Sequence, residues 1–291
     1  MLHQVALFIQ MKNRHPIYII SKGRWESRQT SRALEWMNIP YTIVVEPQEF
    51  DKYAKHIDPS KILVTPFSNL GQGSIPVRNY VWEHSKENGD ARHWLLDDNI
   101  CRFYRMNYNR RIPTDSIGIF CAVEDFTDRY ENVAFSGFNY LGFAADRSEH
   151  IKPFTLNTRI YSMTLIKNDL EYRWRGFYNE DTDLCLRALK DGWCTILFNT
   201  FLGDKATTLK MKGGNTEEVY GDSDNRLKFA KSLQKQHPDV VEIVWKFNRW
   251  HHQVNYKPFK SNTLVRKEGI VVEDKINNYG MILKDLRKEI K

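Results

Sequence analysis

The sequence HWLLDDN, residues 93–99, determines both the fold class and the position of the candidate site. Residues 93–96 form an apolar run of strand length, and the acidic pair follows at once, so we predict a buried strand that ends in Asp97-Asp98-Asn99. Adjacent oxygen ligands at a rigid strand end suit a hard divalent cation. A plain turn uses Asp and Asn equally well, so both interpretations stay open here.

Three strand-and-helix units precede this stretch. Their apolar spacing predicts strands at 17–20, 41–45 and 61–64, followed by helices at 30–37, 50–57 and from Pro76 to just before Gly89. Such alternation predicts a mostly parallel sheet with helices on both faces. Ligands of these sheets lie at the carboxyl ends of the strands. At that edge we expect the Ser21–Arg24 loop, Glu46 and Asp97–Asn99.

The second half of the chain is less regular. We predict strands at 101–106, 133–138, 158–166 and 195–198, helices at 123–130 and 227–237, a polar loop at 205–214 and an apolar run at 240–247. The fold class is therefore α/β, a Rossmann-like mixed, mostly parallel central sheet flanked by helices, with a C-terminal helical or irregular extension. We expect one domain over 1–220, with one half at about 15–100 and a second at about 101–220, and the extension over 221–291 packing on it.

The composition excludes a disordered chain and favours an anionic partner. The 291 residues are 41% hydrophobic and 27% charged, as in globular proteins. There are 43 Lys and Arg against 36 Asp and Glu, a net charge of +7. Such an excess favours nucleic acid, nucleotides or acidic lipid by long-range attraction, although many basic proteins bind none of these.

The cysteines and the N-terminal residues bear on location. Four scattered cysteines, none in a C-x-x-C pair, predict buried free thiols in a reducing compartment rather than a zinc site or disulfide framework (Cys101, Cys121, Cys185 and Cys194). The apolar run at 5–9 is too short for a signal peptide, and no segment approaches the roughly 20 apolar residues of a membrane helix. We therefore expect a cytoplasmic protein with no membrane partner.

A second acidic cluster, NEDTD at 179–183, begins a predicted helix that ends at Gly192. Asn179 is a suitable N-cap, and acidic residues in a first turn complement the helix dipole without any further role. The functional interpretation is that one carboxylate faces the cleft as a general base. A helix N-terminus lowers the pKa of such a carboxylate, whereas burial or neighbouring carboxylates raise it.

The order of these motifs resembles the nucleotide-sugar transferases of the GT-A fold. More narrowly, IYIISKGR (17–24), WLLDDN (94–99), NEDTDL (179–184) and K-x-K-G-G-N (210–215) resemble the TET/JBP-associated glycosyltransferase family. The resemblance spans about residues 17–256. It implies a GT-A-like enzyme, with the donor half at about 15–100 and the acceptor half at about 101–220. Members of this family are associated with bacteriophage DNA hypermodification.

The resemblance also implies roles for particular residues. Asp97, Asp98 and Asn99 would bridge Mn²⁺ or Mg²⁺ to the phosphates of a UDP-sugar, and Asp181, with Glu180 as the rival, would be the base. The donor site would comprise Ser21, Gly23, Arg24, Glu46, Arg78, Asp97, and a closing loop with Lys210, Lys212, Gly213 and Gly214. Asn99 departs from the usual acidic ligand and lowers the negative charge of the site. His251 and His252 are positional candidates for a late metal ligand, or simply structural histidines.

The acceptor implied by phage members is the hydroxymethyl group of a modified pyrimidine in DNA, 5-hydroxymethylcytosine. Candidate DNA contacts combine arginines with interleaved aromatic rings: Arg102, Arg105, Tyr108, Arg110, Arg111, Arg249, Trp250 and Tyr256. Ordinary surface arginines and half-buried rings explain the same pattern. A protein or glycan acceptor, or a non-catalytic nucleotide-sugar-binding module, stays open as an alternative.

Overall fold

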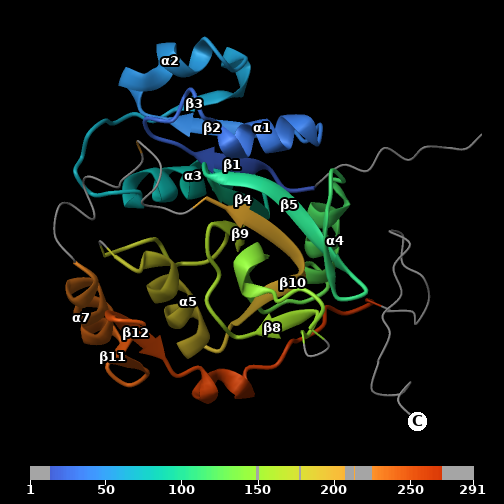
Figure 1. Ribbon diagram of the computed structural model, residues 1–291, viewed down its shortest axis with the longest axis vertical. Coiled ribbons are helices and arrows are strands. Elements are labelled where there is room, and N and C mark those ends of the chain that lie inside the picture. The colour runs from blue at the N-terminus through green and yellow to red at the C-terminus, as the bar shows by residue number, and fades with distance from the viewer. Residues whose placement is uncertain (1–13, 149–150, 177, 207–212, 214–224, 271–291) are drawn as a thin grey trace, which may run out of the picture.

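The structure is a computed structural model that describes residues 14–148, 151–176, 178–206, 213 and 225–270. A twisted sheet runs through the centre, with helices on both of its faces (Figure 1). This architecture confirms the predicted α/β, Rossmann-like class.

The first half contains the three predicted strand-and-helix units and the strand before Asp98. The strands are β1 (Ile17–Ile20), β2 (Thr42–Val45), β3 (Ile62–Val64) and β4 (Arg92–Asp97), and the helices are α1 (Gln29–Trp36), α2 (Phe50–Ala54) and α3 (Ile75–Glu87). The strands are parallel in the order β3-β2-β1-β4. This matches the first four strands of the doubly wound order 3-2-1-4-5-6. Helix α2 ends at Ala54, three residues earlier than predicted.

The second half extends the same sheet. It adds β5 (Ile100–Asn107), β6 (Arg110–Pro113), β7 (Val133–Tyr140), β8 (Phe154–Leu156), β9 (Met163–Lys167) and β10 (Cys194–Lys205), in the overall order β3-β2-β1-β4-β9-β7-β10-β5-β6, with β8 also on β10. Strands β5, β8 and β9 run against all the others. The sheet is therefore mixed and mostly parallel, as predicted.

Several boundaries in this half differ from the sequence prediction. The strand predicted at 158–166 begins only at Met163, because Asn157 and Ser162 have positive φ angles of 56°. The helix predicted at 123–130 is α4 (Gly118–Thr127). Strand β10 continues to Lys205, which the sequence assigned to a loop. The short strands β6 and β8 were not predicted.

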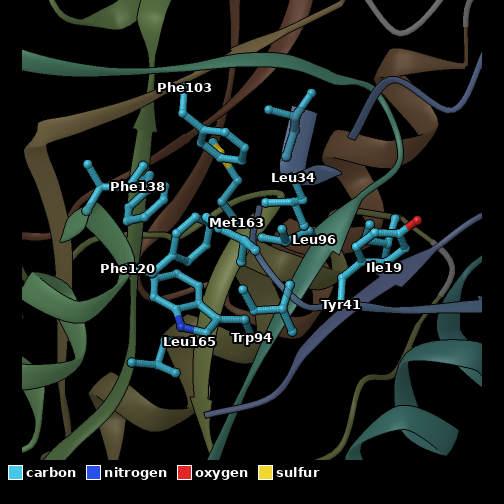
Figure 2. Close-up of a cluster of buried hydrophobic side chains, with 14 of the residues drawn as sticks. Ile19, Leu34, Tyr41, Trp94, Leu96, Phe103, Phe120, Phe138, Met163 and Leu165 are labelled. Atoms are coloured by element: carbon cyan, nitrogen blue, oxygen red, sulfur yellow. The ribbon is translucent and has the colours of Figure 1, made fainter. Parts of the chain in front are cut away.

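Alternating side chains of the strands supply two apolar layers. Ile17 and Ile19 face α1 and α4, whereas Tyr18 faces α3 and α5 (Glu180–Lys190). Figure 2 shows the larger layer, in which the rings of Trp94 and Phe120 lie 5.0 Å apart, centroid to centroid. These buried layers fix the strand ends that carry the polar residues.

The C-terminal extension packs on the outer side of α5. It comprises α7 (Arg226–Gln236), the two-stranded β11 (Val241–Lys246) and β12 (Arg249–Val254), and the short 3₁₀ helix η5 (Lys257–Ser261). Its apolar side chains form one cluster with α5: Leu186, Leu189, Leu233, Val240, Val241 and Phe259. The extension thus contains a β-hairpin that the sequence prediction missed.

Two further predictions concern cysteines and membranes. All four cysteines are free, and three are buried. Cys101 on β5 is exposed, so its predicted burial was wrong. Within the described ranges, no helix is both long and apolar enough to cross a membrane.

Candidate active site

The polar segments predicted for the site meet at one edge of the sheet. Strands β1, β2 and β4 are parallel neighbours, and Ile20 pairs with Asp97 at their carboxyl ends. The Ser21–Arg24 loop, Glu46 and Asp97–Asn99 therefore follow adjacent strand ends. This confirms the placement that the strand-and-helix alternation predicts.

Asp97, the last residue of β4, is held by two cations and a hydroxyl. Arg78 Nη2 donates to its Oδ1 at 3.1 Å, while Lys205 Nζ and Ser162 Oγ donate to its Oδ2 at 2.7 and 2.6 Å. Burial alone would raise the pKa of Asp97, but the charges of Lys205 and Arg78 outweigh it and hold that pKa well below its usual range. Asp97 is therefore a permanent anion. Lys205 and Ser162 were not predicted as site residues.

Arg78 of α3 lies among three carboxylates. Besides Asp97, Glu180 Oε1 lies 3.9 Å from its Nε and Asp181 Oδ1 lies 3.6 Å from its Nη1. We call these four residues and Lys205 the Arg78 cluster. Because Arg78 is 5% exposed and its guanidinium stacks 4.6 Å over the ring of Trp174, its position is fixed by packing.

Asp181 has the protonation properties that a general base needs. Its Oδ1 is buried and has no hydrogen-bond partner among the described residues. Burial raises the pKa of Asp181 to about 7, against the lowering effect of Arg78, and the neighbouring charges of Glu180 and Asp97 add to the rise. A carboxylate that titrates near neutral pH can accept a proton and release it again. The structure thus distinguishes Asp181 from Glu180.

Helix α5 positions Asp181 by an anchor at its first turn. Asn179 is the N-cap residue, but with φ of 55° its side chain makes no cap bond and instead donates to Phe229 O at 3.1 Å. Asp183 is 1% exposed and accepts from Arg187 at 2.9 Å and from His237 Nε2 at the same distance. Asp183 is therefore structural, and α7 holds α5 in place.

Asp98 points away from the Arg78 cluster. Its Oδ1 is ion-paired with Arg24, and its Oδ2 accepts from Ser21 Oγ at 2.7 Å. Tyr53 Oη lies 2.6 Å from Ser21 Oγ and accepts from Arg24 N at 3.1 Å. These bonds lock the loop after β1. Asp98 therefore orders the predicted donor loop, and its oxygens are already engaged.

Two acidic residues that follow β2 in the chain, Glu46 and Glu49, contact the same loop. Both oxygens of Glu49 accept from Gly23 N, at 2.8 and 3.0 Å, a role that the sequence prediction missed. Glu46 accepts from Asn69 N at 3.1 Å and lies 3.7 Å from Lys22 Nζ. Glu46 thus stays at the predicted edge beside the loop.

Gly213, one residue of the predicted closing loop, lies against the loop after β1. Arg24 Nη2 donates to Gly213 O at 3.3 Å. A Cβ on Gly213 would lie 2.4 Å from Gly23 O, so only glycine permits this approach. The predicted Lys210, Lys212 and Gly214 lie outside the described residues.

A divalent cation suits this site by charge rather than by a preformed cage. Within the described segments, no three His, Cys, Asp or Glu side chains are arranged to hold a metal ion, and His251 and His252 belong to no such group. Mg²⁺, however, is usually held by one or two carboxylates together with substrate phosphates. The Arg78 cluster has three carboxylates and two cations, so a diphosphate needs added positive charge there.

Two buried oxygens that lack hydrogen-bond partners in the described part of the chain also favour a cation. Asn99 Oδ1, like that of Asp181, is buried with no hydrogen-bond partner among the described residues. Both are the hard oxygen donors that Mg²⁺ and Mn²⁺ prefer. The donor set therefore fits a cation that arrives with a diphosphate. Asn99 offers a free oxygen, and Asp97 lies in the Arg78 cluster whereas Asp98 points away from it, but Asp97 would have to give up one of its present partners to bind the cation.

The predicted DNA contacts divide between two hairpins. Arg102, Arg105, Tyr108, Arg110 and Arg111 lie on the β5–β6 hairpin (residues 100–113), and its tip residue Tyr108 is 90% exposed. Arg249 and Trp250 lie on the β11–β12 hairpin (residues 241–254), with the partly buried Tyr256 just beyond it. Figure 1 shows β5 and the β11–β12 hairpin far apart. The structure therefore does not gather them into one patch.

Fold and site together define a class: a Rossmann-like α/β protein with a charged site at the carboxyl ends of its strands, where such folds bind nucleotides. The chain belongs to the TET-Associated Glycosyltransferase family, whose model matches residues 15–214. It is a glycosyltransferase. Comparison with curated proteins finds no match.

Proposed function

We propose that this glycosyltransferase moves a sugar from a UDP-sugar to the hydroxymethyl group of 5-hydroxymethylcytosine in DNA, in the cytoplasm of a phage-infected cell. The observation that carries the reaction type is the partly buried Asp181, with a pKa near 7, beside the cations Arg78 and Lys205. A base, and positive charge for a leaving diphosphate, are the two requirements of sugar transfer to a hydroxyl; Arg78 and Lys205 supply part of that charge.

The reaction needs one proton transfer and one exchange of bonds at the sugar. Asp181 accepts the proton of the acceptor hydroxyl while the oxygen bonds to the anomeric carbon. The bond from that carbon to the diphosphate oxygen breaks, and the electron pair leaves with the diphosphate. Arg78 and Lys205 stabilise this charge because they are already fixed by their bonds to Asp97.

The proposed Mn²⁺ or Mg²⁺ would be held by Asp97 and Asn99 together with the donor phosphates, and it would neutralise part of the leaving charge. Asp98 keeps the loop after β1 ordered through Arg24 and Ser21. The contact of Gly213 with that loop supports a part for Gly213 in holding the donor.

The DNA acceptor is supported by charge. The net charge of +7 and the exposed arginines of the β5–β6 hairpin suit a polyanion. A protein or glycan acceptor would use the same donor half and the same base, so only the acceptor test separates them.

The test is mass spectrometry of nucleosides after DNA containing 5-hydroxymethylcytosine is incubated with the protein, Mn²⁺ and a panel of UDP-sugars. We expect the mass of one sugar to be added to hydroxymethylcytidine and nothing to be added with Asp181→Asn. Release of UDP without modified nucleoside would move the acceptor to another class. Neither product with any UDP-sugar would contradict the proposal.

A further inference from the structure

A small cavity of ≈ 250 Å³ lies at the end of β7 and has no part in the mechanism above. Its walls include Tyr140, Phe143, Arg159 and Tyr161. All of them come from the half of the chain that the sequence assigned to the acceptor. A larger cavity of ≈ 980 Å³ lies elsewhere, between β8 and β12, and contacts none of these four residues.

Two walls of the small cavity are bonded to the candidate active site. Tyr161 Oη lies 3.2 Å from Oγ1 of Thr182, the residue after Asp181. Tyr140 Oη lies 2.6 Å from Ser162 Oγ, and that serine donates to Asp97. The cavity is therefore beside the candidate base and on the acceptor side of the Arg78 cluster.

The walls favour a flat aromatic ligand. The rings of Tyr140 and Tyr161 are nearly parallel, at 15°, with centroids 6.2 Å apart, and Phe143 lies 5.4 Å from Tyr140. Phe143 is 66% exposed, so it is free to stack on an entering ring. The volume is below the roughly 300–1,000 Å³ of sites for drug-sized molecules, so it suits a single ring system.

A sugar suits these walls less well. Buried hydroxyl groups need hydrogen-bond partners. The amide of Asn139, which also lines the cavity, is already used, because its Nδ2 donates to Asn199 and its Oδ1 accepts from Tyr140 N. A nucleobase presents two π faces, which match the three rings better than a sugar does.

Arg159 adds a requirement for an anion. Its guanidinium lies 5.0 Å over the ring of Tyr161, and its electrostatic neighbours are Tyr161, Tyr256 and Cys185. No carboxylate among the described residues forms an ion pair with it. A partly buried guanidinium without a counter-ion favours a phosphate, which it can bind through two parallel hydrogen bonds.

We propose that this cavity holds the acceptor base, flipped out of the DNA, with Arg159 on its phosphate and its substituent directed at Asp181. The inference rests on the proposed function for the kind of acceptor. It adds the binding site, its residues and the requirement for a flipped nucleotide.

The test is isothermal titration of the protein with 5-hydroxymethyl-dCMP and, separately, with the corresponding nucleoside. Phe143→Ala removes a stacking ring, so we expect both ligands to bind about tenfold or more weakly. Arg159→Gln should weaken nucleotide binding at least tenfold and leave nucleoside binding unchanged. Trp36→Ala, which removes a ring 58% exposed on α1, is the matched control and should change neither. Unchanged nucleotide binding in both cavity variants would overturn the proposal.

Nucleotide binding and DNA modification, measured separately, distinguish this inference from the proposed function. If wild type binds the nucleotide through Phe143 and Arg159 but modifies no DNA, the cavity assignment stands and the proposed function fails. If wild type modifies DNA and both cavity variants do so with an unchanged KM for the acceptor, the cavity assignment fails alone. Binding of an oligosaccharide that depends on Phe143 and Arg159, with no binding of the nucleotide, would also overturn it.

Discussion

Lys205 Nζ lies 2.7 Å from Asp97 Oδ2, although 108 positions separate the two residues in the sequence. The contact exists because β10 continues to Lys205 and places it at the same sheet edge as the end of β4. Each residue sets the charge of the other: the lysine pKa is raised and the aspartate pKa is lowered by this pairing against the opposite effects of burial. The site is thus one electrostatic unit built from both halves of the chain.

Asp181→Asn should remove transfer while keeping the fold. A general base contributes roughly 10²–10⁴-fold to rate, so we expect kcat to fall by that factor with little change in the KM for donor. The wild-type rate should rise with pH through about 7, because Asp181 must be deprotonated to accept a proton. Steady-state kinetics from pH 5.5 to 9 measure this.

Glu180→Gln is the matched control for that experiment. Glu180 precedes Asp181 in the same turn and also lies near Arg78, at 3.9 Å. We expect at most a few-fold loss and a pH profile with the wild-type midpoint. A loss in Glu180→Gln equal to that in Asp181→Asn would reassign the base.

Loss of the proton from Asp181 should lower the free energy of unfolding as pH rises toward and above 7. Its folded-state pKa of about 7 exceeds the unfolded value of about 3.9, so between these pH values the folded state holds a proton that the unfolded state has released. Stability therefore falls as pH rises through that window. Asp181→Asn removes this decline, and we expect it to be about 1–3 kcal/mol more stable than wild type at pH 8.

Urea unfolding at pH 4.5 and pH 8 measures this difference, with Asp239→Asn as the control. Asp239 is 57% exposed in its pair with Lys190, so its loss should have little effect at either pH. Equal stabilisation of Asp181→Asn at both pH values would show that the gain is not electrostatic.

How far the sequence predicts the site depends on the range of the interactions. Asp97, Asp98 and Asp181 were predicted because each follows a local pattern, a strand end or a first helical turn. Lys205 and Ser162 were missed because nothing near them in the sequence indicates that they face Asp97. Their positions follow from the length of β10 and from the positive φ of Ser162.

The division of the acidic residues was likewise not predictable. Asp97 and Asp98 are adjacent, but alternation at the strand end turns one toward Arg78 and the other toward Arg24. Glu49 could have been suspected from its position near the end of β2, but its bond to Gly23 N depends on the 3₁₀ turn at Pro47–Glu49. The strand end and the helix start that carry Asp97, Asp98 and Asp181 were predictable, and the partners of these side chains were not.

Lys205→Met should weaken donor binding. It removes a cation that is fixed by Asp97 and Ser162, and preorganised donors of this kind contribute about 10²–10³ in rate. We expect a higher KM for UDP-sugar and a kcat lower by at least tenfold. Lys167→Met is the control: it removes a lysine of β9 paired with Asp169 at the other end of the sheet, and activity should not change.

Chelation should abolish transfer. The Arg78 cluster has one more carboxylate than cations, so a diphosphate binds poorly without added positive charge. We expect EDTA to stop sugar transfer and Mn²⁺ or Mg²⁺ to restore it, measured as labelled sugar in DNA.

In Asp97→Asn the metal concentration for half-maximal rate should rise, whereas Asp98→Asn should chiefly lower the Tm. Full activity after exhaustive chelation would contradict the metal prediction.

The arginines of the β5–β6 hairpin should contribute to DNA affinity without reading sequence. Arg105 and Arg110 are exposed, so each can neutralise one phosphate. For the double variant Arg105→Ala and Arg110→Ala we expect weaker binding to all duplexes, and a slope of log K against log salt that is less steep by about 2, or about 1 per contact. Fluorescence anisotropy from 50 to 300 mM salt measures both quantities.

Lys86→Ala, exposed on α3 at the opposite face of the sheet, is the control and should keep the wild-type slope. If the double variant keeps that slope as well, DNA does not cross the β5–β6 hairpin. The β11–β12 hairpin with Arg249, which lies elsewhere on the molecule (Figure 1), is then the surface to alter next.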